Sequence, residues 1–203
     1  MQVVLKEELG ASRKKYLKLM KSKIFIYPTD SIYGIGCDAT NEAAVSRIRS
    51  LKKSNLQPFS IIAPSKEWVY KNCVVEEKEK PYVEALGKKL VISGKKTCFT
   101  VILRLKNKKA IAKNVNQGMD TIGVRIPDHW ITEFVKELSV PIVATSANPT
   151  GEEFMTSVDD LNEHIKEGVD FIIYEGEKKG APSTLIHFDD ERVKIKDRSK
   201  GRH

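Results

Sequence analysis

The sequence is poor in cysteine and histidine, and neither residue type has the spacing that a metal site requires. Cys37, Cys73 and Cys98 are far apart and odd in number, which argues against a disulfide framework and a zinc site. No apolar run approaches the 18 residues of a membrane span, and Glu7 and Glu8 interrupt the N-terminal apolar stretch, so no signal peptide is expected. These absences predict a cytoplasmic protein with reduced thiols and no membrane partner.

The sequence also lacks the familiar catalytic motifs. It contains no serine–histidine–aspartate signature, no Walker lysine motif and no dinucleotide-binding glycine fingerprint. Its polar loops offer hydroxyl, amide and cationic side chains without an evident general base. Such a set suggests catalysis by positioning and charge neutralisation, as in phosphoryl and nucleotidyl transfer.

Positive charge is in excess, with a formal net charge of +8 over 203 residues and a pI near 9.3. This balance points to an anionic partner, either a nucleotide or a nucleic acid. Lysine is spread through the chain, however, and composition alone slightly favours a solvated lysine-rich surface. The length predicts a single domain, residues 1–198, followed by a loose basic tail at 199–203.

Hydrophobic periodicity predicts alternating helices and strands with short connections. The predicted helices cover 12–22, 41–51, 65–68, 76–90, 127–138 and 158–166. The predicted strands cover 24–27, 59–63, 98–103, 121–126, 141–144, 170–174, 183–188 and 192–196. The alternation predicts an α/β fold with a central, mixed sheet and helices on its faces.

Several of the predicted strands are flanked by polar loops. The stretch Pro28–Gly36 carries hydroxyls, a phenol and a carboxylate directly after a strand, where ligands bind in α/β proteins. On this stretch alone, an ordinary polar loop is as good an explanation. A second loop, 145–151, contains a serine, an asparagine and a glycine, and Ser183 precedes a later strand.

Arg125 stands inside an otherwise apolar predicted strand. Because a buried, unpaired guanidinium is costly, it must reach a cavity or an anion. An edge-strand arginine paired with a surface carboxylate is the alternative, and contact with a ligand is the favoured interpretation.

Four short motifs together resemble those of the YrdC-like family of L-threonylcarbamoyl-AMP synthases, over about residues 15–200. They are the opening loop Pro28–Gly36, the strand Thr121–Pro127, the loop Ser146–Gly151 and the tripeptide Pro182–Thr184. The resemblance implies a twisted open sheet around a concave, basic cavity. It also implies that threonine and bicarbonate form a carbamate, which attacks the α-phosphorus of ATP with the help of magnesium carried by the ATP phosphates. Threonylcarbamoyl-AMP and pyrophosphate result, and transfer machinery uses the former to modify tRNA.

The resemblance also implies roles for individual residues. Those expected to hold or enclose threonine are Ser31, Arg125, Ser146, Ser183, Tyr33 and Thr29. Those expected to contact ATP are Lys53, Lys52, Arg49, Gln57, Thr121, Asn148, Thr156 and Arg198.

One segment departs from the family pattern, which has a Lys-x-Arg pair ahead of a proline. Counting back from Pro58 puts the arginine position on Lys53, and a later polar position on Gln57. A one-residue gap would bring Lys52 into the pattern instead, and Arg49 is a further candidate. A lysine lacks the planar guanidinium with which arginine donates two hydrogen bonds to a phosphate.

Two alternatives to the synthase remain open. A non-catalytic RNA-binding protein with the same fold would explain both the altered segment and the charge, and it would bind tRNA or double-stranded RNA with a steep salt dependence. A carbamoyl-transfer domain like those of hydrogenase maturation proteins ranks last, because such domains occur within much larger chains.

Overall fold

The computed structural model describes residues 1–54, 57–189 and 192–198. Its strands are β1 (Gln2–Leu5), β2 (Phe25–Tyr27), β3 (Gly34–Gly36), β4 (Ser60–Ile62), β5 (Cys73–Val74), β6 (Leu90–Ile92), β7 (Lys95–Thr97), β8 (Phe99–Leu105), β9 (Thr121–Arg125), β10 (Ile142–Ser146), β11 (Phe171–Tyr174), β12 (Thr184–Phe188) and β13 (Val193–Lys196). Its α-helices are α1 (Lys6–Ala11), α2 (Arg13–Met20), α3 (Glu42–Leu51), α4 (Lys66–Asn72), α5 (Lys80–Glu84), α6 (Ile131–Leu138) and α7 (Glu163–Gly168), and a 3-10 turn covers Lys108–Ala110. None of the described helices is long and apolar enough to cross a membrane.

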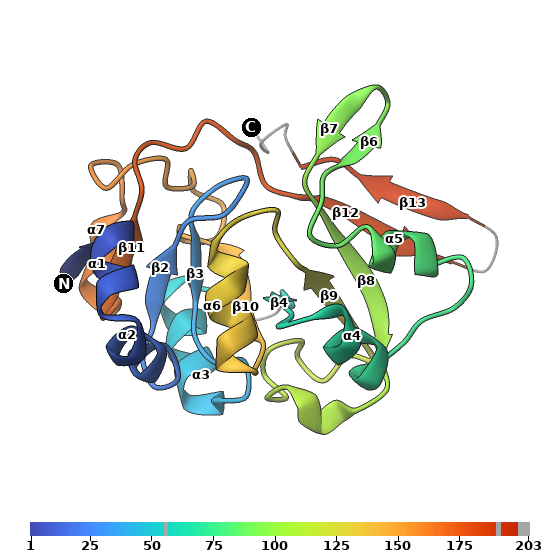
Figure 1. Cartoon of the computed structure of the whole chain (residues 1–203), viewed down its shortest axis with the longest axis horizontal. Coiled ribbons are helices and arrows are strands. Elements are labelled where there is room, and N and C mark those ends of the chain that lie inside the picture. The colour runs from blue at the N-terminus through green and yellow to red at the C-terminus, as the bar shows by residue number, and fades with distance from the viewer. Residues whose placement is uncertain (55–56, 190–191, 199–203) are drawn as a thin grey trace.

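One mixed sheet of eleven strands organises the described residues (Figure 1). Its order is β1-β11-β2-β3-β10-β4-β9-β8-β12-β13, with β5 paired to β8 beside this path, and β6 and β7 form a separate hairpin. Five neighbouring pairs along the main path are antiparallel, and β1–β11, β11–β2, β4–β9 and β8–β12 are parallel. The predicted mixed α/β fold is thereby confirmed.

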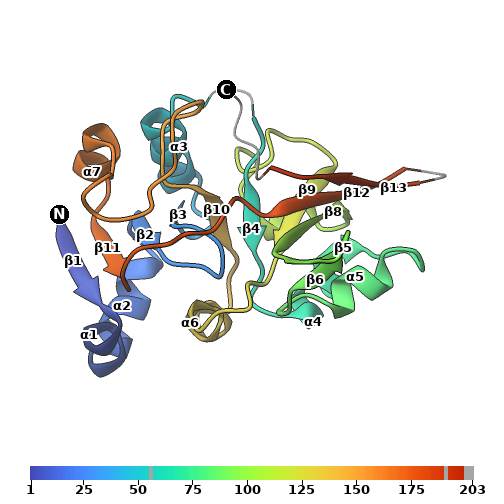
Figure 2. The same ribbon diagram turned by 90° about the horizontal axis from the view of Figure 1, so that it is seen from above.

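Helices cover the sheet on both sides (Figure 2). On one side α3 packs its apolar face, including Val45 and Ile48, into the larger hydrophobic core. On the other side α2 and α6 contact each other and contribute Tyr16 and Phe134 to a second core. Helix α3 begins where the sequence predicts, because the side chain of Asn41 accepts a hydrogen bond from the Ala44 amide at 3.0 Å.

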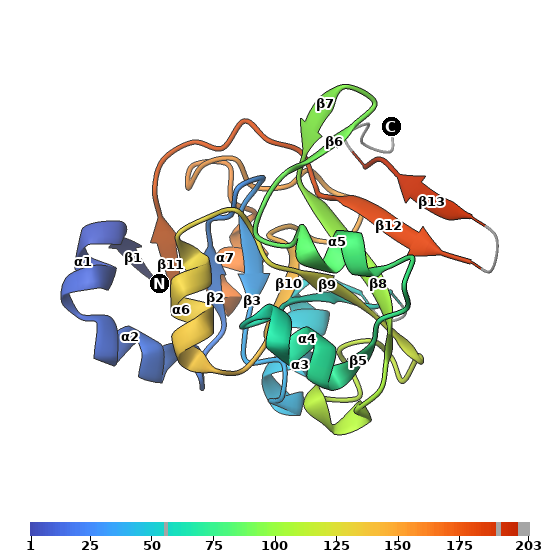
Figure 3. The same ribbon diagram turned by 45° about the vertical axis from the view of Figure 1, so that its right-hand side comes forward.

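Residues 175–183 join β11, near one edge of the sheet, to β12, near the other (Figures 1 and 3). This connection, which we call the strap, has no helix or strand of its own. It therefore carries Ser183 across the molecule from one half of the sheet to the other.

Some predicted elements are shorter than expected. The helix predicted over 76–90 is confined to α5, because Pro81 occupies its first turn and Gly87 has a positive φ of 87° just beyond its end. The helix predicted over 158–166 begins only at Glu163, since the Asn162 side chain caps it.

Other elements were not predicted at all. They are β1, α1, β5, the β6–β7 hairpin and β3, which lies within the predicted opening loop. Strand β3 ends at Gly36, where a Cβ would stand 2.5 Å from the Val143 carbonyl oxygen, so glycine permits this close pairing with β10. The basic tail predicted for 199–203 lies outside the described residues.

Candidate functional site

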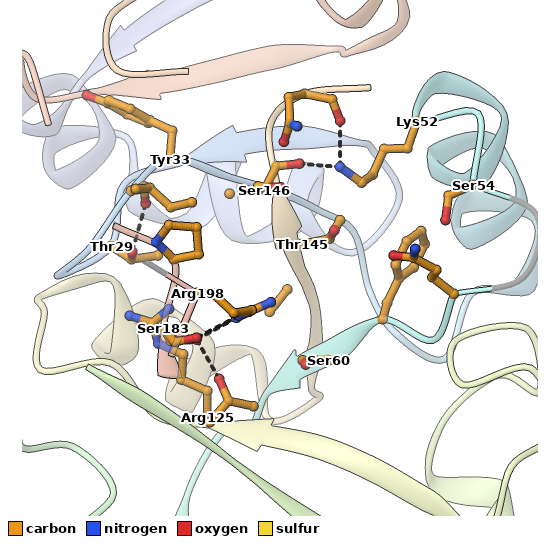
Figure 4. Close-up of a pocket in the computed structure, with 18 of the residues that line it drawn as sticks. Thr29, Tyr33, Lys52, Ser54, Ser60, Arg125, Thr145, Ser146, Ser183 and Arg198 are labelled. Carbon is orange, nitrogen blue, oxygen red and sulfur yellow. Dashed lines mark hydrogen bonds between the residues drawn. The ribbon is translucent and has the colours of Figure 1, made fainter. Parts of the chain in front are cut away.

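A cavity of about 260 Å³ opens where the ends of several strands meet the opening loop and the strap (Figure 4). Its charged lining residues are Lys52, Arg125 and Arg198, and no carboxylate side chain is among the described residues that line it. Hydroxyl groups come from Tyr27, Thr29, Tyr33, Ser54, Ser60, Thr100, Thr145, Ser146, Thr150 and Ser183. A concave site with this lining suits an anionic ligand rich in hydrogen-bonding groups.

Arg125 defines one end of the cavity, at the last residue of β9. Its Nη2 donates to the Asp30 carboxylate and, at 3.0 Å, to Ser31 Oγ. Asp30 is almost fully buried and also accepts a bond from the Asp128 amide at 3.0 Å. Burial alone would raise the pKa of Asp30, but the Arg125 charge and these hydrogen bonds outweigh burial and lower it.

This pairing decides between the two interpretations of Arg125. Strand β9 lies between β4 and β8 and is no edge strand, and the carboxylate partner is buried and not at the surface. Among the described residues only Nη2 of the guanidinium has a hydrogen-bond partner, and Arg125 lines the cavity. The remaining donors can therefore serve a ligand.

Ser183 and Arg198 lie beside Arg125 (Figure 4). Arg198 donates from Nη2 to Ser183 Oγ at 3.0 Å and from Nε to the Ser183 carbonyl at 2.8 Å, and Thr100 Oγ1 lies 2.8 Å from the same hydroxyl. Burial, and then the neighbouring Arg125 charge, lowers the pKa of Arg198. Two guanidinium groups held this way repel each other, and a bound anion would relieve that repulsion.

The strap is held tightly where it crosses the opening loop. A Cβ on Gly180 would stand 2.0 Å from the carbonyl oxygen of Ser31, so only glycine fits without displacing backbone. At the root of the strap, the Tyr33 hydroxyl donates to the Gly176 carbonyl at 2.7 Å and accepts from the Glu175 amide at 3.1 Å. Ser183 thus owes its place in the cavity to contacts with the opening loop.

Lys52 defines the opposite end of the cavity, directly after the last residue of α3. Its Nζ donates to the backbone carbonyls of Ser146 at 2.6 Å and Asn148 at 2.5 Å. The side chain is buried, and no described carboxylate forms an ion pair with it. Burial lowers the pKa of Lys52 to about 8.

Asn148 contributes an unusual polar atom to this end. Its Nδ2 donates to the carbonyls of Pro149 at 2.8 Å and Glu152 at 2.7 Å, and these two acceptors fix the orientation of the amide. Its Oδ1 is buried and has no hydrogen-bond partner among the described residues. Buried acceptors are nearly always satisfied, and since Asn148 lines the cavity, this oxygen can accept from a donor that arrives with a ligand.

The structure brings nine of the fourteen predicted site residues together in the lining. They are Thr29, Tyr33, Lys52, Gln57, Arg125, Ser146, Asn148, Ser183 and Arg198. Ser31 stands just behind the wall, where it contacts Arg125 and Thr29.

Four predicted ATP contacts lie elsewhere. Thr121 is exposed at the far end of β9, Thr156 is bonded to Asp160 outside the lining, and Lys53 is exposed. Lys52, and not Lys53, is therefore the lysine that the altered segment presents to the cavity.

Arg49, the fourth, lies beneath the cavity and not in its wall. It donates to the carbonyls of Asn114 (2.6 Å), Ser54 (3.1 Å), Gln57 (3.0 Å) and Val115 (2.9 Å). The guanidinium also stacks 4.2 Å from the ring centroid of Phe59. Four of its five N–H donors are engaged with backbone carbonyls, so Arg49 shapes the segment that follows α3, and it is not among the residues that line the cavity.

Sequence reasoning overlooked several polar residues of the site, namely Asp30, Ser54, Ser60, Thr100 and Thr145. Asp30 is part of the opening loop, but its partner Arg125 lies 95 positions further along the chain. Nothing in the sequence marks the two residues as partners. Ser60 and Thr100 interrupt apolar strands, which is the same signal that singled out Arg125.

A family model covering Sua5, YciO and YrdC, described as telomere recombination, matches residues 18–199. The chain belongs to the Sua5/YciO/YrdC family. A Methanocaldococcus jannaschii protein named provisionally for threonylcarbamoyl-AMP synthesis is 36% identical over 189 residues, which are 89% of this chain and 84% of that protein. The threonylcarbamoyl-AMP synthase of Idiomarina loihiensis is 31% identical over 173 residues, 82% of this chain and 87% of that one.

Solved structures of family members share the fold. The P. abyssi Sua5 complex with L-threonine superposes with a TM-score of 0.79 and 25% identity, over 96% of this chain. This chain spans only 56% of that Sua5 chain. E. coli YciO, at 20% identity, superposes with a TM-score of 0.77 over 99% of this chain and 96% of its own.

Proposed function

We propose that this family member is an L-threonylcarbamoyl-AMP synthase that uses L-threonine, bicarbonate and ATP. The observation that carries the proposal is a cavity lined by three cations and no carboxylate among the described residues, with a buried acceptor left unpaired on Asn148. Relatives named for this activity, and a Sua5 structure that contains L-threonine, support it.

In this proposal the two ends of the cavity bind different substrates. The remaining donors of Arg125, together with the hydroxyls of Ser183 and Thr29, hold the threonine carboxylate and side chain. The end formed by Lys52, Ser146 and Asn148 holds the nucleotide, so this proposal assigns Ser146 to ATP, whereas the family resemblance implies a threonine contact. The α-phosphate then lies between the two ends, within reach of Arg198.

The reaction needs no nucleophile from the protein. The threonine amine and bicarbonate condense to a carbamate with loss of water, and a carbamate oxygen attacks the α-phosphorus. The bond from this phosphorus to the bridging oxygen breaks, and pyrophosphate leaves with the electron pair. The side chains contribute by holding the reactants in line and by neutralising charge.

Magnesium fits this arrangement as a partner of the triphosphate. The described residues contain no cluster of three or more histidine, cysteine, aspartate or glutamate side chains, so the donors on offer are hydroxyl and amide oxygens. Such a set leaves the metal to the phosphates, where it would neutralise their charge. Asn148 and the neighbouring hydroxyls would be the protein atoms nearest to it.

The biological setting follows from the product. A mixed anhydride of a carbamate and a phosphate is a reactive acyl donor, so a transferase that modifies tRNA is the expected consumer. The reduced thiols suit a cytoplasmic location for these steps.

The direct test measures pyrophosphate release from ATP with each substrate omitted in turn. A synthase releases pyrophosphate only when both threonine and bicarbonate are present. Pyrophosphate release that does not depend on threonine would reject the proposal, and so would the absence of release when all three substrates are present. Salt-dependent binding of tRNA without binding of ATP or threonine would favour the RNA-binding alternative instead.

A further inference from the structure

We infer that Lys52 is a positioning residue: its ammonium clamps the 146–150 loop through two backbone carbonyls, and this clamp presents Asn148 to the nucleotide. The inference deepens the proposed function and rests on it for the identity of the ligand. The clamp itself is a property of the unliganded chain and can be tested without any activity.

Lys52 engages the loop from both its side chain and its backbone. Nζ donates to the carbonyls of Ser146 and Asn148, and the Lys52 carbonyl accepts from the Thr150 amide at 2.9 Å. The loop is therefore fastened to the end of α3 at three points within five residues.

The consequence for Asn148 follows from this geometry. Its carbonyl is held by Lys52, while its side-chain amide is held by the carbonyls of Pro149 and Glu152. With both groups fixed, the buried Oδ1 has no freedom to find a partner within the loop. Lys52 thereby keeps an unsatisfied acceptor in place for a ligand donor.

A side-chain nitrogen with at least two N–H donors is required for this role. Two carbonyl oxygens converge on one atom, and a third N–H of the ammonium remains for a further acceptor. The charged side chains on the surrounding elements are Arg49, Lys53 and Glu152, with Arg125 and Arg198 across the cavity, and no ion pair joins Glu152 to Lys52 in the described part of the chain.

The test compares amide hydrogen exchange in the unliganded Lys52→Met variant and the wild type. We expect exchange at Asn148 and Thr150 to accelerate at least tenfold, while the amides of β11 are unchanged. In the pyrophosphate assay the half-saturating ATP concentration should rise at least tenfold and that of threonine less than twofold. Lys71→Met, which changes an exposed lysine on α4 that is not part of the lining, is the matched control and should change neither measurement.

Unchanged loop exchange in Lys52→Met would overturn the inference, and weakened ATP binding in that case would make Lys52 a direct phosphate ligand. If the protein proves to lack synthase activity, the exchange result still decides whether the clamp exists. If the variant fails to fold, the wild type provides a second measurement. Opening the clamp exposes Lys52 to water and returns its pKa from about 8 toward its ordinary value, so opening becomes less favourable as the pH rises. Protection of the Thr150 amide, corrected for its intrinsic exchange rate, should therefore rise at least threefold between pH 7 and 9, and constant protection would contradict the inference.

Discussion

The two ends of the cavity place a cation in the protein interior in opposite ways. At one end Arg125 is paired with the buried carboxylate of Asp30. At the other end Lys52 has no described carboxylate partner and is held by two carbonyl dipoles. The pKa of Asp30 is lowered by its partner, although burial opposes the shift, and the pKa of Lys52 is lowered by burial alone.

This difference shows which end is robust to changes in pH. The arginine–carboxylate pair stays charged throughout the neutral range, so the proposed threonine end keeps its charge. The Lys52 end depends on a proton that is lost at mildly alkaline pH. An unpaired buried ammonium is costly to the fold, which suggests that the chain retains it for function.

Removing one partner of the Arg125–Asp30 pair should have the largest effect. Arg125→Met leaves a buried carboxylate unpaired, so we expect the free energy of unfolding to fall by about 3–5 kcal/mol. Pyrophosphate release should fall at least 1,000-fold. In the double variant with Asp30→Asn, urea denaturation should show most of the stability restored while activity stays absent. Recovery of activity in the double variant would contradict the role of Arg125.

The pH dependence of the free energy of unfolding distinguishes the Lys52 end of the cavity from the Arg125 end. The pKa of Lys52 is about 8 in the folded chain and near its ordinary value of 10.5 in the unfolded chain, so the unfolded state binds more protons between these pH values. Stability contributed through this group therefore rises with pH.

The check compares urea denaturation of the wild type and Lys52→Met across this window. The difference in unfolding free energy, wild type minus variant, should increase by about 2–3 kcal/mol from pH 7.5 to 10.5. A difference that stays flat would show that Lys52 is not a buried, titrating ammonium. Asp30 acts in the same sense in a more acidic window, since its pKa is also lowered in the folded chain: its contribution is present above the ordinary carboxyl pKa and is lost as the pH falls through the carboxyl range.

Substitution of Gly180 tests whether the strap holds the Arg125 end of the cavity in place. Gly180→Ala places a methyl group against the Ser31 carbonyl and should cost about 1–3 kcal/mol of stability by overpacking. Threonine affinity should fall with it, because the strap positions Ser183. Gly10→Ala is the control: nothing lies within 4 Å of its added Cβ within α1, so thermal denaturation should show equal or higher stability. If Gly180→Ala keeps the stability and the threonine affinity of the wild type, the strap does not cross the opening loop as closely as described.

The smallest expected effect concerns Asn148. Replacing it with alanine removes the orphan acceptor, so ATP affinity should fall about tenfold, the value of one buried hydrogen bond. Threonine affinity should stay within twofold. Calorimetry with each ligand separates the two effects, and an equal loss for both ligands would argue against two distinct ends.

The sequence predicted the fold class because its apolar runs and caps are local signals, as the Asn41 cap of α3 illustrates. Most of the site residues predicted from the sequence and the family resemblance also lie in the lining, since polar residues at strand ends stand out against apolar neighbours. The roles of individual cations were not predictable in this way. Lys52, Lys53 and Arg49 are neighbours in sequence, and only the packing of α3 sends one into the cavity, one to solvent and one beneath it.

The central claim is that threonine binds at the Arg125 end and ATP at the Lys52 and Asn148 end. Calorimetric titration of L-threonine and of ATP into the Asp30→Asn/Arg125→Met variant and into Asn148→Ala tests it directly. We predict that the first variant loses threonine binding and keeps ATP binding, and that the second keeps threonine binding and binds ATP about tenfold more weakly. Threonine binding that survives the loss of Arg125 would contradict it.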